Sequence, residues 1–363
     1  MNEFIPWARP DIGEEEVNAV AEAVKSTWIG GNGPLTKEFE EGVSKKLNVD
    51  YVIAVANGTL ALICSLQALM KGKPEPVVGV PTFTFIATVN SAFAVGTPVL
   101  FDLDVSTWNM EKYIVSIDEK KLSSLDIIMP VDVGGNPVNY DEMKKLGLPI
   151  VADSAEAIGA SYKGKPIGSQ ADIHCFSLHS AKIITTGEGG LITTNNIDLY
   201  DQMRSIVNQG YAGNKRPWEY LHQNIGFNYR MTEMQSAIGL VQLKKLDKYV
   251  KERNEMAHIY RDIIGDKASY QVTTKDSIHP YFIFGILIKN QIEFCKEMFK
   301  NNIQVKVTFK PAHKQPCYRH LFGYENLPDS ERIARKIVSL PIWNGLGEEK
   351  VKYIAETARR LLK

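Results

Sequence analysis

Cysteine is scarce in this chain and widely spaced. The four cysteines are Cys64, Cys175, Cys295 and Cys317. No two of them have the short spacing of a structural zinc site or of a disulfide framework. We therefore predict no metal site and a reduced, cytoplasmic protein.

Net charge and long apolar runs are lacking as well. Lysine and arginine together number 42, as do aspartate and glutamate, and this balance gives no general attraction to nucleic acid or to an anionic membrane. No apolar run is long enough to span a bilayer. The acidic start MNEFIPWARPDIGEEE lacks the basic and then apolar order of a signal peptide. The sequence predicts neither a nucleic-acid partner nor a membrane partner.

What the chain does have is an alternation of short apolar runs and helical patterns. Runs such as YVIAVA, PVVGVP and PIVAD are apolar on both faces and are separated by helical segments. This is the pattern of a mostly parallel sheet with helices on both sides. We predict an α/β protein with a large domain over residues 13–250 and a smaller C-terminal α+β domain over residues 251–363. Residues 1–12 are expected to pack near the smaller domain.

Candidate ligand-binding residues stand where predicted strands end, which is where open α/β sheets bind their ligands. Asn57-Gly58-Thr59 follows the strand VIAVA. There a glycine lets the backbone approach a ligand, and a helix N-terminus attracts phosphate. Asp153 closes the strand PIVAD, and Glu156 follows one helical turn later, so both carboxylates can face one site. Both motifs have a plainer interpretation as helix caps.

The stretch FSLHSAKIITTGEGG carries further candidates. Strand alternation places Ser177 and His179 on one face. A serine hydroxyl suits a phosphate there, whereas for His179 we favour a satisfied core histidine. Lys182 is either a surface lysine beside a turn or an amine that bonds covalently to a carbonyl carbon. Thr185 and Thr186 are expected to hydrogen-bond the turn that follows.

Together these residue types describe one site. A phosphate cradle, a carboxylate for a ring nitrogen, a hydroxyl and a nucleophilic amine are the groups that hold pyridoxal 5'-phosphate (PLP). The aldehyde of PLP forms a Schiff base with a lysine. Phe85, in PTFTFIATVN, is a candidate for stacking on the ring, with a core aromatic as the alternative.

The chain resembles, nearly from end to end, the DegT/DnrJ-type sugar-nucleotide aminotransferases, and most of all their perosamine-forming members. The resemblance rests on several motifs that stand in the family's order, namely STWIGGNGPLTKEFE, VANGTLAL, VPTFTFIATVN, VADSAEAIGA, FSLHSAKIITTGEGG and IGFNYRMTEMQSAIGLVQL. It implies the aspartate aminotransferase-like fold, known as fold type I, with PLP as the cofactor.

The resemblance also implies a role for each residue around the cofactor ring. Lys182 is the catalytic lysine that forms the Schiff base. Asp153 pairs with the pyridine nitrogen, and Phe85 stacks on the ring. Glu156 approaches the ring hydroxyl or the ring face.

Further implied roles concern the phosphate and the sugar. Gly58, Thr59 and Ser177 hold the phosphate. Asn228, in GFNYR, reaches the same phosphate from the other subunit of a homodimer whose active sites are shared. His313, in FKPAHKQP, lies near the sugar nucleotide.

The implied reaction moves the amino group of L-glutamate to a keto-sugar nucleotide. The nearest likeness points to C4 of GDP-4-keto-6-deoxymannose, with UDP- or dTDP-linked 4-keto-6-deoxy sugars as alternatives. One segment departs from the family, because Asp132 and Gly134 stand where many relatives have histidine and tyrosine. We expect this change to leave the cofactor site intact and to alter the sugar contacts.

Three other functions compete with this one. A PLP-dependent sugar dehydratase has the same fold, but relatives of that type replace the lysine with histidine. Ser180 and Lys182 have the spacing of a serine–lysine hydrolase dyad, for which the sequence has no matching oxyanion motif. A non-catalytic sensor built on an aminotransferase fold is the third, and the full set of cofactor residues argues against it.

Overall fold

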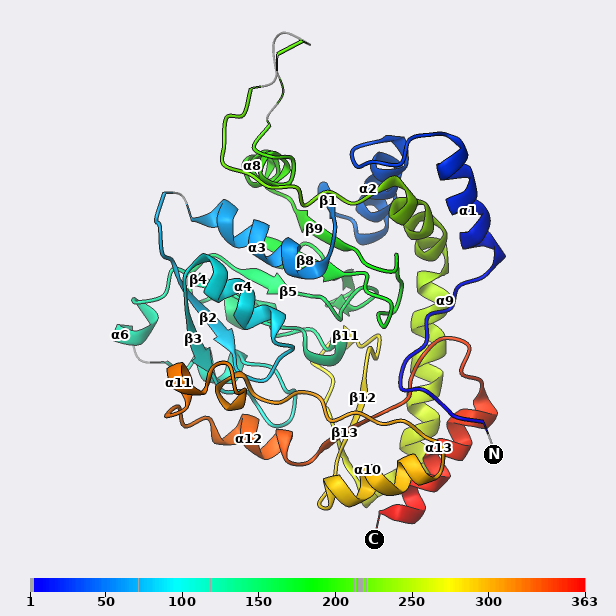
Figure 1. The fold of residues 1–363 in the computed structure, drawn as a ribbon. Helices are drawn as coiled ribbons and strands as arrows, with labels where there is room; N and C mark the ends of the chain where they lie inside the picture. The colour runs from blue at the N-terminus through cyan, green and yellow to red at the C-terminus, as the bar shows by residue number, and fades with distance from the viewer. Residues whose placement is uncertain are drawn as a thin grey trace.

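The structure of the protein is a computed structural model that describes residues 3–70, 72–117, 119–211, 213, 218–219 and 221–362 (Figure 1). A mostly parallel sheet lies at its centre. Its strands are β1 (Tyr51–Val55), β2 (Val77–Pro81), β3 (Thr97–Phe101), β4 (Ile127–Ile128), β5 (Val151–Asp153), β8 (Ile173–Ser177) and β9 (Gly190–Thr194).

The strand order across this sheet is β3-β2-β4-β5-β8-β9-β1. β2 pairs in parallel with β3 and β4, and β5 pairs in parallel with β8. Parallel bridges between Ile128 and Ile150 and between Val131 and Asp153 join these two groups. β9 runs antiparallel to both of its neighbours, β8 and β1. The predicted, mostly parallel sheet is therefore confirmed.

Helices cover both faces of the sheet. α3 (Gly58–Leu69), α4 (Ala87–Val95) and α8 (Ile197–Val207) pack on one face, and α2 (Pro34–Leu47), α7 (Tyr140–Lys144) and α9 (Glu233–Ile264) pack on the other. In β1, Val52 and Ala54 belong to the core beneath α2, α7 and α9. Ile53 and Val55 belong to the core beneath α3, α4 and α8. Successive side chains point to opposite faces, so a strand covered on both sides is apolar throughout.

Several shorter or outer elements complete this part of the chain. α1 (Glu14–Lys25) packs on α9. The short helices α5 (Glu111–Ile114), α6 (Glu119–Leu122) and η1 (Val133–Gly135) lie between strands. A small antiparallel sheet joins β6 (Ser161–Tyr162) to β7 (Lys165–Pro166) and to β11 (Ser277–Ile278).

The C-terminal part has its own sheet and core. β12 (Phe284–Leu287) lies between β10 (Ser269–Tyr270) and β13 (Ile337–Leu340), with antiparallel pairing throughout. The accompanying helices are η2 (Gly265–Lys267), α10 (Gln291–Lys300), η3 (Ala312–Lys314), α11 (Arg319–Phe322), α12 (Pro328–Ala334) and α13 (Glu348–Leu361). The core between them includes Met298 and Ile354 together with Tyr260 from the last turns of α9.

The predicted domain boundary at residue 250 falls inside α9, which is one continuous helix. α9 contacts both α1 and α2 as well as α13. Near the N-terminus, Ile5 pairs with Ile303, and the indole N–H of Trp343 donates to the carbonyl oxygen of Pro6. The division at residue 250 stays a prediction.

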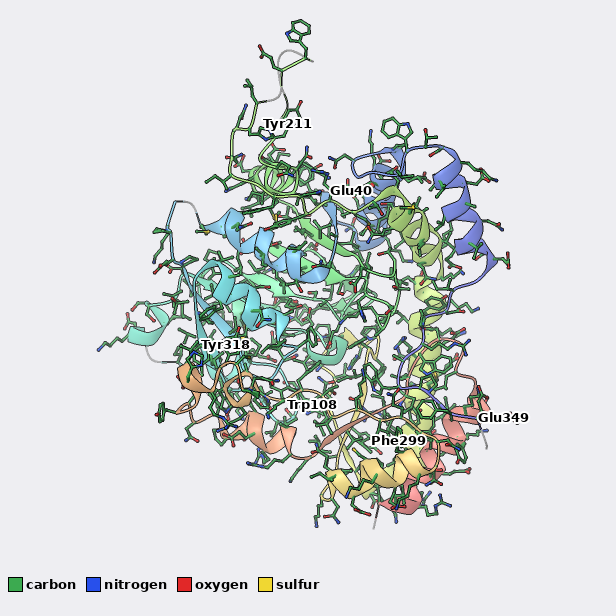
Figure 2. All side chains as sticks on the ribbon, in the orientation of Figure 1. Glu40, Trp108, Tyr211, Phe299, Tyr318 and Glu349 are labelled. Atoms are coloured by element: carbon green, nitrogen blue, oxygen red, sulfur yellow. The ribbon has the colours of Figure 1, made fainter. Side chains whose placement is uncertain are left out.

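Trp108 forms part of the joint between the central sheet and the C-terminal part (Figure 2). Its side chain is fully buried and lies against Gly285 of β12. A Cβ atom at position 285 would come within 2.6 Å of the indole ring. The missing side chain of Gly285 therefore makes room for the tryptophan.

The arrangement of strands decides where a ligand can bind. β1, β5 and β8 are parallel to one another, so their carboxyl ends, near Val55, Asp153 and Ser177, lie at one edge of the sheet. Because β9 is antiparallel, the loop from β8 to β9 turns back at this same edge and carries Lys182. Within the described ranges, no helix is both long enough and apolar enough to cross a membrane.

Candidate active site

Asp153 is buried at the carboxyl end of β5. Its Oδ2 accepts a 2.6 Å hydrogen bond from the hydroxyl of Thr88, and its Oδ1 accepts a 3.1 Å bond from the N–H of Ala155. Burial raises the pKa of this carboxyl, while the Thr88 bond and the nearby charge of Lys182 act in the opposite direction. The carboxylate is thus positioned by neutral donors, and a cationic ligand would stabilise its ionised form.

Glu156 and Lys182 form an ion pair at the edge of the sheet where β1, β5 and β8 end. The Lys182 Nζ lies 3.5 Å from Oε1 of Glu156. The other oxygen of Glu156 accepts a 2.8 Å hydrogen bond from the N–H of Gly134. Burial raises the pKa of Glu156, and the charge of Lys182 opposes the shift. The structure therefore brings together Asp153, Glu156 and Lys182, as predicted from their positions after strands.

The predicted phosphate-binding residues lie at and beside the start of α3. The Asn57 side chain caps this helix by accepting the N–H of Leu60 at 2.9 Å. The N–H groups of Gly58 and Thr59 come before the first bond within the helix, at its positive end. A Cβ atom on Gly58 would lie 2.9 Å from Cβ of Ser177, so the glycine lets the helix start approach that serine. The three predicted phosphate residues are adjacent in space.

The turn after Lys182 is held by the two threonines, as expected. The Thr185 hydroxyl donates to the carbonyl oxygen of Leu178 at 2.9 Å, and the Thr186 hydroxyl donates to that of Glu188 at 2.7 Å. Gly187 has φ of 82°, a left-handed conformation that glycine adopts without strain. The loop that presents Lys182 is thereby tied back to the end of β8.

The segment around Asp132 and Gly134, in which the chain departs from many relatives, contacts Asp153, and the expected change in the sugar contacts stays a prediction. The backbone N–H of Asp132 donates to the carbonyl oxygen of Asp153 at 3.1 Å. The Asp132 carboxylate accepts hydrogen bonds from the hydroxyls of Tyr140 and Ser154 and from the N–H of Val138. Asp132 is therefore a buried, fully bonded support behind β5.

A histidine completes the support. The Nε2 of His174 accepts the N–H groups of Gln170 and Ala171, so the proton sits on Nδ1, which donates to Ser154. Burial lowers the pKa of His174 to about 3, so the ring is neutral. Ser154 in turn donates to Asp132 at 2.6 Å.

Two other residues considered in the sequence, Phe85 and His179, lie at the surface. The side chain of Phe85 is 60% exposed and meets Phe309 edge to face, at 6.3 Å between ring centroids. An exposed ring at this position is free to stack on a ligand. The expectation of a core histidine at position 179 is wrong, because the His179 side chain is 49% exposed and lies 3.8 Å from the carboxylate of Glu188.

His313 and Asn228 differ in accessibility. His313 is fully buried, with Nδ1 2.7 Å from the hydroxyl of Thr82 and Nε2 3.3 Å from Glu331. Both ring nitrogens thus have protein partners. Asn228 is exposed, on a segment that runs beside the end of β1, where Ala56 donates to the carbonyl oxygen of residue 229. The roles assigned to both residues stay predictions.

Three contacts of the site were not predicted from the sequence. Thr88 stands three residues after Phe85 at the start of a helix, and its hydroxyl is a signal that a search for partners of Asp153 could have used. Gly134 holds Glu156 through its N–H. The ring of Phe282 lies 4.1 Å from the Lys182 Nζ, and no motif in the sequence links these two positions.

These residues fit PLP. Buried carboxylates gather around one amine, so the site favours a further positive charge such as a protonated pyridine nitrogen. The close approach of Gly58 to Ser177 leaves the free N–H groups of a helix start beside a hydroxyl, as a phosphate requires. In the described part of the chain, no group of three or more His, Cys, Asp or Glu side chains is arranged to hold a metal ion.

The buried carboxylates predict how stability depends on pH. Burial raises the pKa of Asp132 from 3.8 to about 6, and the pKa shifts of Asp153 and Glu156 have the same sign. The folded protein therefore holds protons that the unfolded chain releases. This contribution to stability is complete below about pH 4 and is lost as the pH rises through about 6. Asp132→Asn should flatten the decline in stability of the cofactor-free protein over that range.

Urea unfolding midpoints at a series of pH values measure this slope. Asp141→Asn is the matched control, because Asp141 is an exposed carboxylate whose ion pair with Lys163 lowers its pKa. That variant should keep the decline. Equal slopes in the parent and Asp132→Asn would contradict the prediction.

Known proteins are similar to this chain in sequence and in fold. The chain matches the DegT/DnrJ/EryC1/StrS aminotransferase family over residues 10–359. It is 35% identical over 364 residues to the GDP-perosamine synthase of Escherichia coli O157:H7, covering 98% of this chain and 97% of that protein. It is 31% identical over 379 residues to the UDP-4-amino-4,6-dideoxy-N-acetyl-beta-L-altrosamine transaminase of Campylobacter jejuni subsp. jejuni serotype O:23/36 (strain 81-176), covering 99% of this chain and 98% of that protein.

A solved structure agrees over the whole chain. PseC of Helicobacter pylori, an aminotransferase involved in the biosynthesis of pseudoaminic acid, superposes with a TM-score of 0.91 at 27% identity, and the match covers 99% of each chain. Sequence, fold and site geometry therefore lead to one conclusion: the chain belongs to the DegT/DnrJ/EryC1/StrS aminotransferase family and is a PLP-dependent sugar aminotransferase of fold type I.

Proposed function

We propose that this enzyme transfers the amino group of L-glutamate to C4 of GDP-4-keto-6-deoxymannose, in the biosynthesis of an amino sugar for a surface polysaccharide such as O-antigen. The similarity to the E. coli GDP-perosamine synthase supports the choice of sugar nucleotide. A UDP- or dTDP-linked 4-keto-6-deoxy sugar is the second candidate. The similarity to the C. jejuni transaminase, whose name contains a UDP-linked sugar, supports a UDP substrate.

The observation that carries the proposed chemistry is the amine of Lys182 held 3.5 Å from a buried carboxylate at the ligand edge of the sheet. When bound, PLP supplies a reactive aldehyde and a ring that accepts electrons. Lys182 would hold the cofactor through its Nζ, which is the nucleophilic amine at this edge of the sheet. Once the amino donor has displaced it, the same nitrogen takes a proton from the donor and later returns one, as a general base and acid.

The other residues hold and orient the cofactor. Asp153 pairs with the ring nitrogen and keeps it protonated, since a buried carboxylate favours a nearby cation. Gly58, Thr59 and Ser177 bind the phosphate through N–H and hydroxyl donors. The exposed side chain of Phe85 would stack on the ring. Glu156 orients the Lys182 amine and would approach either the ring hydroxyl or the ring face.

Around the sugar nucleotide, His313 acts through its neighbours. Both of its ring nitrogens already contact protein groups, those of Thr82 and Glu331. It therefore shapes the wall of the sugar side by fixing η3 against Thr82, which directly follows β2.

We further propose a homodimer in which Asn228 reaches the phosphate of the partner's cofactor. After α8 the segment at Tyr211 projects away from the body (Figure 2), and residue 227 is back beside α8, where its N–H donates to the carbonyl oxygen of Ile206. This projection exposes large apolar side chains, including Trp218 at 81% and Ile225 at 87%. Exposed apolar groups of this size are typical of surfaces that a partner covers. Asn228 lies at the base of the same segment.

The first test concerns Lys182. Lys182→Ala should lower turnover by roughly 10²- to 10⁴-fold or more, because it removes both the covalent attachment and the proton carrier. Borohydride reduction of the PLP-loaded parent should fix the cofactor on the peptide that contains Lys182. Lys163→Ala, which changes an exposed lysine, is the control and should be fully active. Fixation on a different lysine, or a protein that binds no PLP, would contradict the proposed role of Lys182.

The second test identifies the sugar nucleotide. Values of kcat/KM for GDP-, UDP- and dTDP-linked 4-keto-6-deoxy sugars, measured side by side with glutamate, report discrimination directly. We expect GDP-4-keto-6-deoxymannose to be preferred and aminated at C4. A clear preference for a UDP or dTDP sugar would overturn the GDP assignment and leave the aminotransferase activity standing.

The third test asks whether active sites are shared. Subunits carrying Lys182→Ala are mixed with subunits carrying Asn228→Ala. If Asn228 acts across the interface, each hybrid dimer has one complete site, and a random mixture recovers about a quarter of the parent activity. If hybrids form and no activity returns, Asn228 does not act across the interface.

A further inference from the structure

The reactive amine has an aromatic neighbour from a distant part of the chain. The Lys182 Nζ lies 4.1 Å from the centroid of the Phe282 ring. Phe282 is buried and stands just before β12, whereas Lys182 follows β8. A cation over a ring face at this distance is attracted by the negative face of the ring.

Phe282 is held in place from two sides. Its backbone N–H donates to the carbonyl oxygen of Gly134 at 3.0 Å. The ring meets the indole ring of Trp7 edge to face, at 6.0 Å between centroids and an angle of 88°. The position of the ring is therefore fixed by the backbone and by packing, independently of Lys182.

Gly134 connects the two neighbours of the amine. Its N–H donates to Glu156 and its carbonyl oxygen accepts from Phe282. Gly134 has φ of 73°, and a Cβ atom there would lie 3.0 Å from Ile283. A residue with a side chain would be strained at this position, so glycine allows one residue to clamp both the carboxylate and the ring.

The two neighbours act on the amine in different ways. Glu156 attracts a charged amine strongly and in a set direction. The ring also favours the charged form, but it forms no directional hydrogen bond. The buried ring therefore contacts the amine without fixing its direction.

We propose that Phe282 is a positioning residue of the transamination reaction, whose ring face stabilises the released amine of Lys182 when that amine carries the proton taken from the amino donor. In this step the C–H bond of the donor breaks and an N–H bond forms on Lys182. The electron pair of the C–H bond passes to the ring system of the bound cofactor. The inference rests on the proposed role of Lys182 and adds a residue to it.

The direct test uses the cofactor-free protein. Acetic anhydride acylates only uncharged amines, and mass spectrometry gives the rate at the Lys182 peptide relative to the exposed Lys163. At one pH, Phe282→Leu should raise the relative rate at Lys182 by about 2- to 5-fold, because loss of the ring face destabilises the charged amine. Phe282→Tyr keeps a ring face and should label like the parent. An unchanged or lower rate in Phe282→Leu would overturn the proposal.

Wider access to the amine is tested separately. The ratio of labelling rates for acetic anhydride and the bulkier benzoic anhydride should be the same in the parent and in the variant. A ratio that shifts towards the bulkier reagent would mean that an opened site explains the faster labelling, and the proposal would fail. Phe282→Met serves as a second variant without a ring if Phe282→Leu does not fold, as judged by its melting curve.

Kinetics of the loaded enzyme give an independent readout. Phe282→Leu should lower kcat by about 2- to 5-fold and leave KM for the amino donor unchanged, because the ring acts on the protonated amine after the donor has bound. A change in KM alone would contradict this role. Labelling needs neither cofactor nor sugar nucleotide, so its result stands even if the proposed substrate is incorrect.

Discussion

The burial of negative charge at the carboxyl end of β5 is the constraint on which the rest of the site depends. The carboxylates of Asp132, Asp153 and Glu156 all lie in the interior, where a charge is costly unless it is paired and hydrogen-bonded. Thr88 and Gly134 supply hydrogen bonds, and Lys182 supplies a positive charge. The carboxylates outnumber the amine, so the site is prepared for a cationic ring. We propose that the cost of burying these charges is offset when the cationic ring of the cofactor binds.

The topology of the sheet explains how these groups meet. Parallel strands deliver Asp153, Ser177 and the start of α3 to one edge. The antiparallel strand β9 then turns the chain back, so that the loop carrying Lys182 closes over that edge. The remaining wall comes from the C-terminal part of the chain, whose Phe282 reaches the amine. The Lys182 amine therefore contacts Glu156 from the part of the chain around the central sheet and Phe282 from the C-terminal part.

The sequence alone predicted the features that depend on local pattern. Strand ends located Asp153, Ser177 and Gly58, because a doubly covered strand is apolar along its length and ends where polar residues begin. Contacts between distant segments left no such pattern. Phe282 has no motif that links it to Lys182, and His179, which was expected in the core, lies beyond the end of β8 at Ser177 and is half exposed. The support of β5 by Asp132 was missed because its hydrogen bonds depend on the folded arrangement of three separate segments.

The proposed pairing of Asp153 with a protonated ring nitrogen can be measured as a difference in affinity. The cofactor-free enzyme is titrated with PLP and with the analogue in which that nitrogen is replaced by a C–H group. Fluorescence titration gives both dissociation constants. We expect the parent to bind PLP more tightly than the analogue and Asp153→Asn to lose most of this preference. Equal affinity of the parent for the two compounds would contradict the proposed pairing.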